Sequence, residues 1–153
     1  MPINQYQLIQ IQSEGDLSGL LIQADRKLAV FSGNIKTKVS PAAPILMQED
    51  GVADESSLIE QMPPMQTLGK RFYFGPFPNR TITLIKLVTT QDATTITIRS
   101  TPVTLTSAGQ TYTFRVESPT VLISDKPVLV AQVSTPLILI SNITCVSCCG
   151  TFL

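Results

Sequence analysis

Hydrophobic and polar residues alternate in short runs along most of this chain, with the period of a β-strand. In TYTFRVE, Tyr112, Phe114 and Val116 fall on one side of the predicted strand, and Thr, Arg and Glu fall on the other. The segments 83–90 (TLIKLVTT) and 94–100 (TTITIRS) predict two more strands, joined by a polar turn. A helical period is almost absent, so the pattern predicts an all-β fold of antiparallel strands.

Two further local features follow from the same pattern. QYQLIQIQ, near the N-terminus, is predicted to be a strand with Tyr6 and Leu8 on one face and Ile9 and Ile11 on the other. TSAGQ predicts a tight turn in which Gly109 takes a positive φ, because glycine has no Cβ to clash there.

The alternation stops between Asn34 and Gly69. This stretch contains SPAAP, QEDGVADESS and LIEQMPPMQTLGK, and it is longer than an ordinary connection between strands. We expect a long loop with a short helical turn at Ser56–Gln61, favoured by the acidic residues at its start. The MPPM segment then predicts an extended path, with Met62 and Met65 packing inward.

Two segments of the chain resemble each other. QADRKLAVF and ISDKPVLVA align with Asp25 on Asp125, and each aspartate is expected to cap a tight turn. The similarity has two explanations. The first is chance, because two unrelated β-hairpins of similar composition also align this well. The second is a tandem duplication of an Ig-like β-sandwich unit whose first copy is incomplete. The predicted organisation is an incomplete first β-unit, a connecting loop, a second β-sandwich unit and a Cys-containing tail, at residues 1–35, 36–70, 71–141 and 142–153.

Composition narrows the range of functions. Hydrophobic residues make up 43% of the 153 residues, the formal net charge is zero, and histidine and tryptophan are absent. Without a basic surface we expect no nucleic-acid partner, and without histidine there is no Ser-His-Asp chemistry, so we predict a non-enzyme without a cofactor. The carboxylates Asp54 and Glu60 near Lys70 are interpreted as structural, with a buried Glu60 that bonds loop amides or pairs with Lys70 or Arg71.

The three cysteines, Cys145, Cys148 and Cys149, lie close together near the C-terminus. Three thiolates without histidine do not complete a structural zinc site, and the adjacent Cys148 and Cys149 are poorly placed to pair with each other. We expect disulfides within the tail, to another chain or to a segment outside this sequence, with free thiols as the alternative. The N-terminus lacks the pattern of a signal peptide, and polar residues and prolines interrupt the apolar segment 128–153, so no transmembrane segment is predicted.

Two glycosylation sequons occur, at Asn79 and Asn142, and Asn79 follows a turn-forming GPFP segment. Threonine and serine are abundant on the predicted outer faces of the strands. The simple explanation of their abundance is the β-propensity of threonine, and the alternative is that they are sites of O-glycosylation.

Three longer segments carry a family resemblance: DLSGLLIQADRKLAVFSGN, DESSLIEQMPPMQTLGKRFYFGPFPNRT and LISDKPVLVAQVS, in order from Asp16 to Ser134. They resemble the N-terminal domain of the IgGFc-binding protein family, which occurs in extracellular, mucus-associated and surface-adhesion proteins. Glu60, Gln61, Pro63 and Pro64 lie in the middle motif, and we interpret them as anchors of the loop rather than as a polyproline ligand. The resemblance implies a domain that begins before Met1. Leu68 stands where the family usually has tryptophan, and the cysteines that family members often carry around the loop are absent.

These observations lead to a functional hypothesis and an alternative. We expect a non-enzymatic protein, extracellular or at the cell surface, that is structural or adhesive: a filament subunit that assembles with copies of itself by β-strand complementation. The incomplete first unit and the apolar tail TPLILIS motivate this hypothesis. The alternative is a binding module that recognises a glycan, an extracellular glycoprotein or an immunoglobulin-like partner through the loop 34–69.

Overall fold

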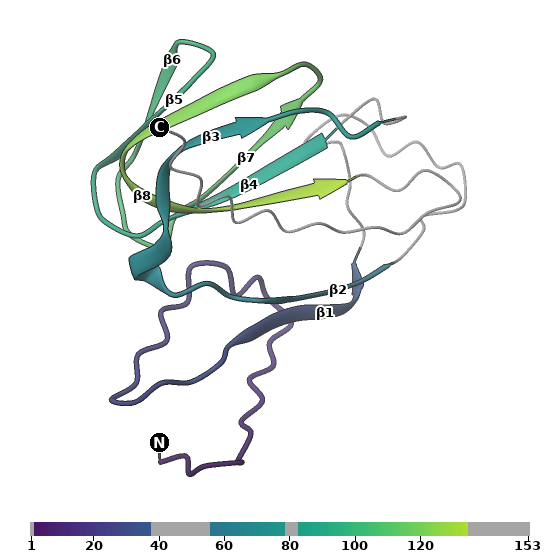
Figure 1. The fold of residues 1–153 in the computed structure, drawn as a ribbon, viewed down its shortest axis with the longest axis vertical. Coiled ribbons are helices and arrows are strands. Elements are labelled where there is room, and N and C mark those ends of the chain that lie inside the picture. Colours follow the sequence, from purple (N-terminus) through teal and green to yellow (C-terminus); the bar gives the residue numbers. More distant parts are fainter. Residues whose placement is uncertain (1, 38–55, 79–82, 135–153) are drawn as a thin grey trace.

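The computed structural model describes residues 2–37, 56–78 and 83–134. Within these residues the fold is all-β and antiparallel, as predicted, and the one helix is the short 3-10 helix η1, Met65–Thr67 (Figure 1). The strands are β1 Phe31–Thr37, β2 Ser56–Gln61, β3 Gly69–Phe74, β4 Thr83–Thr89, β5 Thr94–Ile98, β6 Thr101–Leu105, β7 Thr111–Val116 and β8 Thr120–Ser134.

The strands form two sheets of unequal size. β1 and β2 make a two-stranded ribbon, and β3–β8 make a six-stranded sheet in the order β6-β5-β8-β4-β7, with β3 also paired to β8. The long strand β8 pairs with β3 and β5 through its first half and with β4 through its second half. Figure 1 shows that β8 bends near its middle, so that the sheet curls into a sandwich-like body, called the sandwich below.

The sandwich has a hydrophobic core because inward positions alternate along its strands. Along β4, buried and half-buried residues alternate, and Ile85 and Leu87 are fully buried in the core. The predicted faces of β7 are confirmed: Val116 is buried, Tyr112 and Phe114 are half-buried, and the residues between them are exposed. The other buried hydrophobic residues are Phe72, Phe74, Ile96, Leu105, Leu122, Val128 and Val130.

Buried polar groups in the sandwich are paired. Every buried side-chain nitrogen and oxygen of the described residues has a hydrogen-bond partner. The Gln132 amide, for example, donates through Nε2 to the carbonyl oxygen of Gly75 at 2.9 Å, which ties β8 to the segment after β3. A buried polar group without a partner would cost about 1–3 kcal/mol, so these bonds are part of what makes the core stable.

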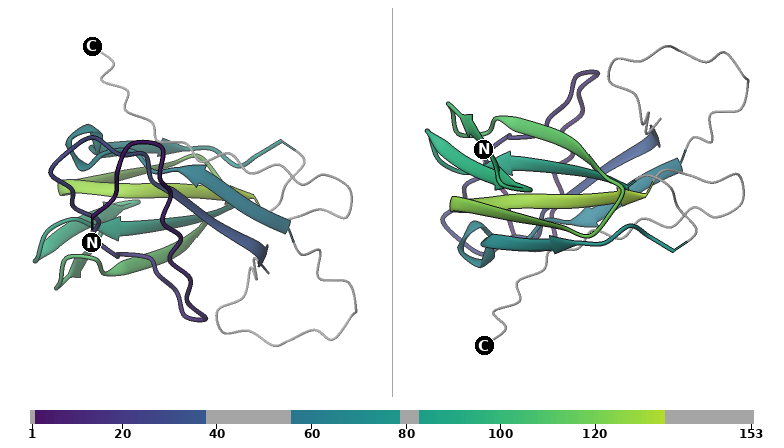
Figure 2. Two further views of the ribbon diagram at one scale, coloured as in Figure 1. Left: turned by 90° about the horizontal axis from the view of Figure 1, so that it is seen from below. Right: turned by 90° about the horizontal axis from the view of Figure 1, so that it is seen from above.

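The N-terminal segment differs from its prediction. QYQLIQIQ is not a strand; its residues have no regular structure beyond a turn at Gln5–Tyr6, and they are all exposed. The reason is that an isolated strand leaves its backbone groups unpaired, and in the described part of the chain no strand lies beside this segment. The segment 2–30 and the ribbon lie together on one side of the sandwich (Figures 1 and 2).

The expected helical turn at Ser56–Gln61 is also wrong, because this segment is β2. It pairs with β1 in a register that sets Phe31 opposite Gln61 and Gly33 opposite Ile59. Long-range pairing therefore satisfies the backbone of LIEQ, which a local helix signal could not foresee. The aligned segments QADRKLAVF and ISDKPVLVA also differ: the first contains a bend before β1, and the second lies inside β8. That the two segments arose by duplication stays a prediction.

Candidate binding surface

The ribbon joins two of the quoted motifs. AVFSGN supplies β1 and LIEQMPP supplies β2, and a backbone bond from Met62 N to Val30 O, at 2.8 Å, extends the pairing by one step. Phe31 and Ile59 are diagonal neighbours on one face of the ribbon, and they are 62% and 73% exposed. The motifs that were expected to frame a loop thus build a small sheet with two exposed apolar side chains on one face.

The predicted loop anchors lie in and just after β2. Glu60 and Gln61 are exposed, so the expectation of a buried Glu60 is wrong; it faces solvent opposite Ser32. Pro63 is half-buried, and Pro64 precedes η1, where its carbonyl oxygen accepts from the backbone N and the Oγ1 of Thr67 at 3.0 and 2.8 Å. These bonds connect η1 to Pro64, and the anchoring roles of Glu60, Gln61, Pro63 and Pro64 stay predictions.

Lys70 does not pair with Glu60 in the way we expected. Its Nζ donates to the carbonyl oxygen of Asp125 at 2.8 Å, across the bend of β8. Met62 is half-buried, in line with an inward-facing position, but Met65 is exposed, so the expected inward packing of both methionines is wrong for Met65. Met65 lies in η1, and no residue of that short helix is buried.

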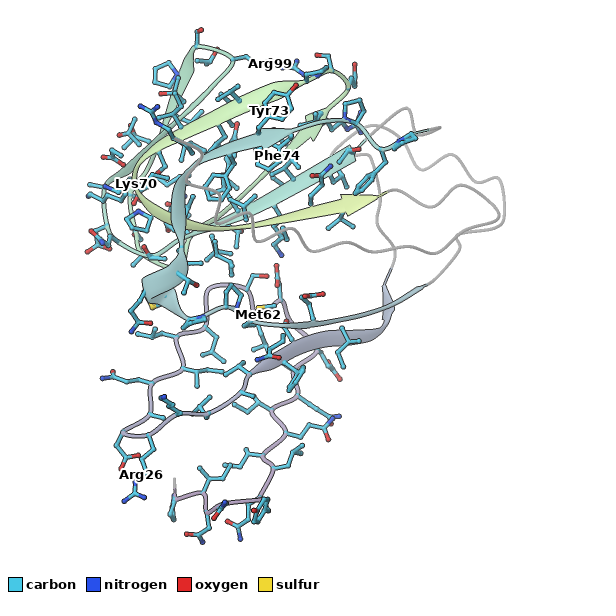
Figure 3. The ribbon with its side chains drawn as sticks, viewed as in Figure 1. Arg26, Met62, Lys70, Tyr73, Phe74 and Arg99 are labelled. Atoms are coloured by element: carbon cyan, nitrogen blue, oxygen red, sulfur yellow. The ribbon has the colours of Figure 1, made fainter. Side chains whose placement is uncertain are left out.

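The two aspartates of the aligned segments lie in different surroundings. Asp125 is in the bend of β8, and its Oδ1 accepts a hydrogen bond from the backbone N of Thr95 at 2.8 Å, so the carboxylate binds β5. Lys126 also holds the bend of β8 against the turn before β5, because its Nζ donates to the carbonyl oxygens of Asp92 and Ala93. Asp25 lies in an exposed bend of the N-terminal segment beside Arg26, which points away from the sandwich in Figure 3. A role in capping a tight turn stays a prediction for both Asp25 and Asp125.

A contact between the N-terminal segment and the sandwich was missed. Asp16, in the DLSG motif, pairs with Lys86 of β4 at 2.7 Å and also accepts from the backbone N and the Oγ of Ser18 at 2.9 and 2.6 Å. Next to it, the turns at Gly19 and Gly109 meet backbone to backbone, and both glycines have a positive φ. We call Asp16, Ser18, Gly19, Lys86 and Gly109 the clasp. No local pattern connects residues so distant in sequence.

The stability of the clasp depends on pH, because the carboxylate of Asp16 takes part in it. The hydrogen bonds from Lys86 and Ser18 lower the pKa of Asp16 from 3.8 to about 2. Because the folded-state pKa is depressed, the stabilisation is complete above about pH 4 and is lost as the pH falls through about 2. The pair is largely exposed, so we expect its contribution to stay below about 1 kcal/mol. In an NMR titration the Lys86→Met variant should return the pKa of Asp16 most of the way to 3.8; an unchanged pKa would contradict this assignment.

A second exposed surface lies on the sandwich itself. On β3 and β8 the register pairs Arg71 with Ile123 and Tyr73 with Val121, and directly opposite residues share a face. All four are exposed; the values are 68% for Tyr73, 48% for Val121 and 43% for Ile123. We call these four residues the β3–β8 face. Tyr73 and its inward-facing neighbour Phe74 are labelled in Figure 3.

Two kinds of feature are not found among the described residues. Among them there is no group of three His, Cys, Asp or Glu side chains that could hold a metal ion. No helix in the described part of the chain is long and apolar enough to cross a membrane. The predicted glycosylation sites Asn79 and Asn142 and the cysteines Cys145, Cys148 and Cys149 lie outside the described residues, so their roles stay predictions.

The fold and its surfaces define a sandwich-like, all-β module with exposed apolar side chains. A family model described as IgGFc binding protein matches residues 1–137, and the chain belongs to this family. Neither the comparison with curated proteins nor the comparison with solved structures found a match. The family membership confirms the resemblance in the sequence and supports an extracellular, binding-type module.

Proposed function

We propose that this chain is a non-enzymatic extracellular module that binds a protein partner, and that the Fc region of immunoglobulin G is the partner to test first. The observation that carries the proposal is the family match over residues 1–137. The exposed apolar side chains of the ribbon and of the β3–β8 face support it, because soluble monomers rarely expose contiguous apolar patches without a binding role.

The test is direct binding of the purified full chain to immobilised human Fc by surface plasmon resonance, with Fab fragments of the same antibody as the control. We expect saturable binding to Fc and none to Fab. Binding to neither fragment, or equal binding to both, would refute Fc recognition.

The loop 34–69 is the recognition element that we expect from the sequence. Thr37 and Ser56 are opposite each other at the open end of the ribbon, so residues 38–55 can be replaced by an Asn-Gly turn that closes β1 and β2 as a hairpin. If the loop recognises a glycan or an immunoglobulin-like partner, this variant should fold with an unchanged circular dichroism spectrum and lose binding. Retained binding would remove the loop from the interface.

Assembly by β-strand complementation is the second candidate, and the N-terminal segment favours it. In residues 2–30 the side chains of Tyr6, Leu8 and Leu21 are 96%, 86% and 67% exposed, and the segment contains no strand. A strand from another chain would pair this backbone and cover these side chains. Sedimentation velocity over a rising concentration series, with negative-stain microscopy, should then show growing oligomers or filaments. A single monomeric species at every concentration would refute assembly.

A further inference from the structure

We infer that the β3–β8 face, formed by Arg71, Tyr73, Val121 and Ile123, is the surface on which the protein partner docks. The inference rests on the proposed function and deepens it, because it names a surface of the sandwich, separate from the loop, and commits to the Fc region as its occupant. It also states the chemistry of the occupant: a protein surface that presents a carboxylate beside apolar side chains.

The first argument is the contrast with the outward positions of β6 and β7, the strands at the two ends of the sheet order. On β7 the exposed positions carry Thr111, Thr113 and Arg115, and on β6 the position opposite Thr95 is the exposed Thr104. These faces are polar, as expected for a sheet that meets water on one side. The β3–β8 face instead exposes an aromatic and two β-branched aliphatic side chains as adjacent cross-strand neighbours. Exposed apolar side chains that lie next to one another are more informative than single ones scattered over a surface.

The second argument is charge. Arg71 is exposed on this face, and the one ion pair between described residues is the distant pair of Lys86 and Asp16. The neighbouring cation Lys70 is already bonded to the Asp125 carbonyl. Arg71 is therefore the positive charge on this face that a carboxylate of the partner can meet. Tyrosine and arginine are also the residue types that most often dominate binding energy at protein interfaces.

The third argument is rigidity. β8 is paired on both edges at Leu122 and Ile123, with β3 on one side and β5 on the other, and Val121 is paired with β3. The bend that follows is pinned by the bond from Thr95 N to the Asp125 carboxylate. The face is thus ordered before a partner arrives, so docking loses little conformational entropy.

The experiment measures binding of immobilised Fc to the wild-type full chain and to two variants, Arg71→Glu and Tyr73→Thr. Both residues are exposed, and threonine keeps a high β-propensity, so the variants should fold; melting curves check this. The matched control is Arg115→Glu, the same charge reversal on the exposed face of β7. We expect each variant of the β3–β8 face to weaken binding by about tenfold or more, as for a central interface residue, and the control to change it by less than about twofold.

The outcomes separate the two proposals. If the wild-type chain binds Fc and both variants bind as tightly, the β3–β8 face is not the docking surface, while the proposed function stands. If the wild-type chain does not bind Fc, Fc recognition is refuted and the inference about the β3–β8 face is overturned with it. Hydrogen exchange of the complex gives an independent check that needs no variant: amides of β3 and of the first half of β8 should gain protection, and protection confined to other segments would overturn the inference.

Discussion

Replacing Leu87 by alanine is expected to lower the free energy of unfolding of the sandwich by about 2–5 kcal/mol. Leu87 is fully buried, and it lies on β4 between Tyr112 of β7 and Val130 of β8. Shortening it removes apolar contacts and leaves a cavity. The neighbouring strands β7 and β8 are held by backbone pairing with β4, so they cannot easily move to fill that cavity.

The measurement is urea denaturation followed by circular dichroism, with Val88→Ala as the matched control. Val88 is the next residue on β4, but it is half-exposed on the other face of the sheet. We expect the control to lose well under half as much stability as Leu87→Ala. Equal losses in the two variants would mean that the hydrophobic core is not where the alternation of β4 places it.

β4, β5 and β7 could be predicted from sequence because each has a regular alternation of hydrophobic and polar residues. β5 also has a partner close along the chain, since it forms a hairpin with β6 in which Thr94 lies opposite Leu105. The partners of β4, which are β7 and β8, lie far along the chain and could not be foreseen. β2 could not be predicted, because LIEQ is short, carries apolar residues on both faces, and pairs with a strand on the far side of the loop. QYQLIQIQ shows the converse: its alternation indicates a strand, but alternation alone does not supply a neighbour.

The candidate surface was harder to predict than the fold, again for a physical reason. In GKRFYF the aromatic residues Phe72, Tyr73 and Phe74 are consecutive, so the sequence does not show which of them face the core. Only the pairing of β3 with β8 separates the buried phenylalanines from the exposed tyrosine. The clasp is still less visible, since the partner of Asp16 is Lys86 on another element.

The clasp yields the second prediction, in which replacing Gly19 by alanine should detach the DLSG turn from the sandwich. A Cβ at Gly19 would lie 2.1 Å from the carbonyl oxygen of Gly109, a backbone atom that cannot swing aside, and the φ of Gly19 is +92°, where L-residues are strained. Strain of this kind costs about 1–3 kcal/mol before the clash is counted. The docked position of the turn should therefore become less populated by about tenfold or more.

The pKa of Asp16 reports this detachment directly, because its low value of about 2 depends mainly on Lys86, which lies on the sandwich. In the Gly19→Ala variant we expect an NMR titration to show the pKa rising toward 3.8, while the melting temperature of the sandwich changes little because its core is separate from the turn. The control is Gly15→Ala: its Cβ would lie 3.6 Å from Ser13 Oγ, an ordinary contact, and its φ is not positive. A pKa that stays near 2 in both variants would show that the turn does not depend on the close approach of the two glycines. A pKa that rises only in Gly19→Ala would identify the paired turns as the feature that holds the N-terminal segment against β4.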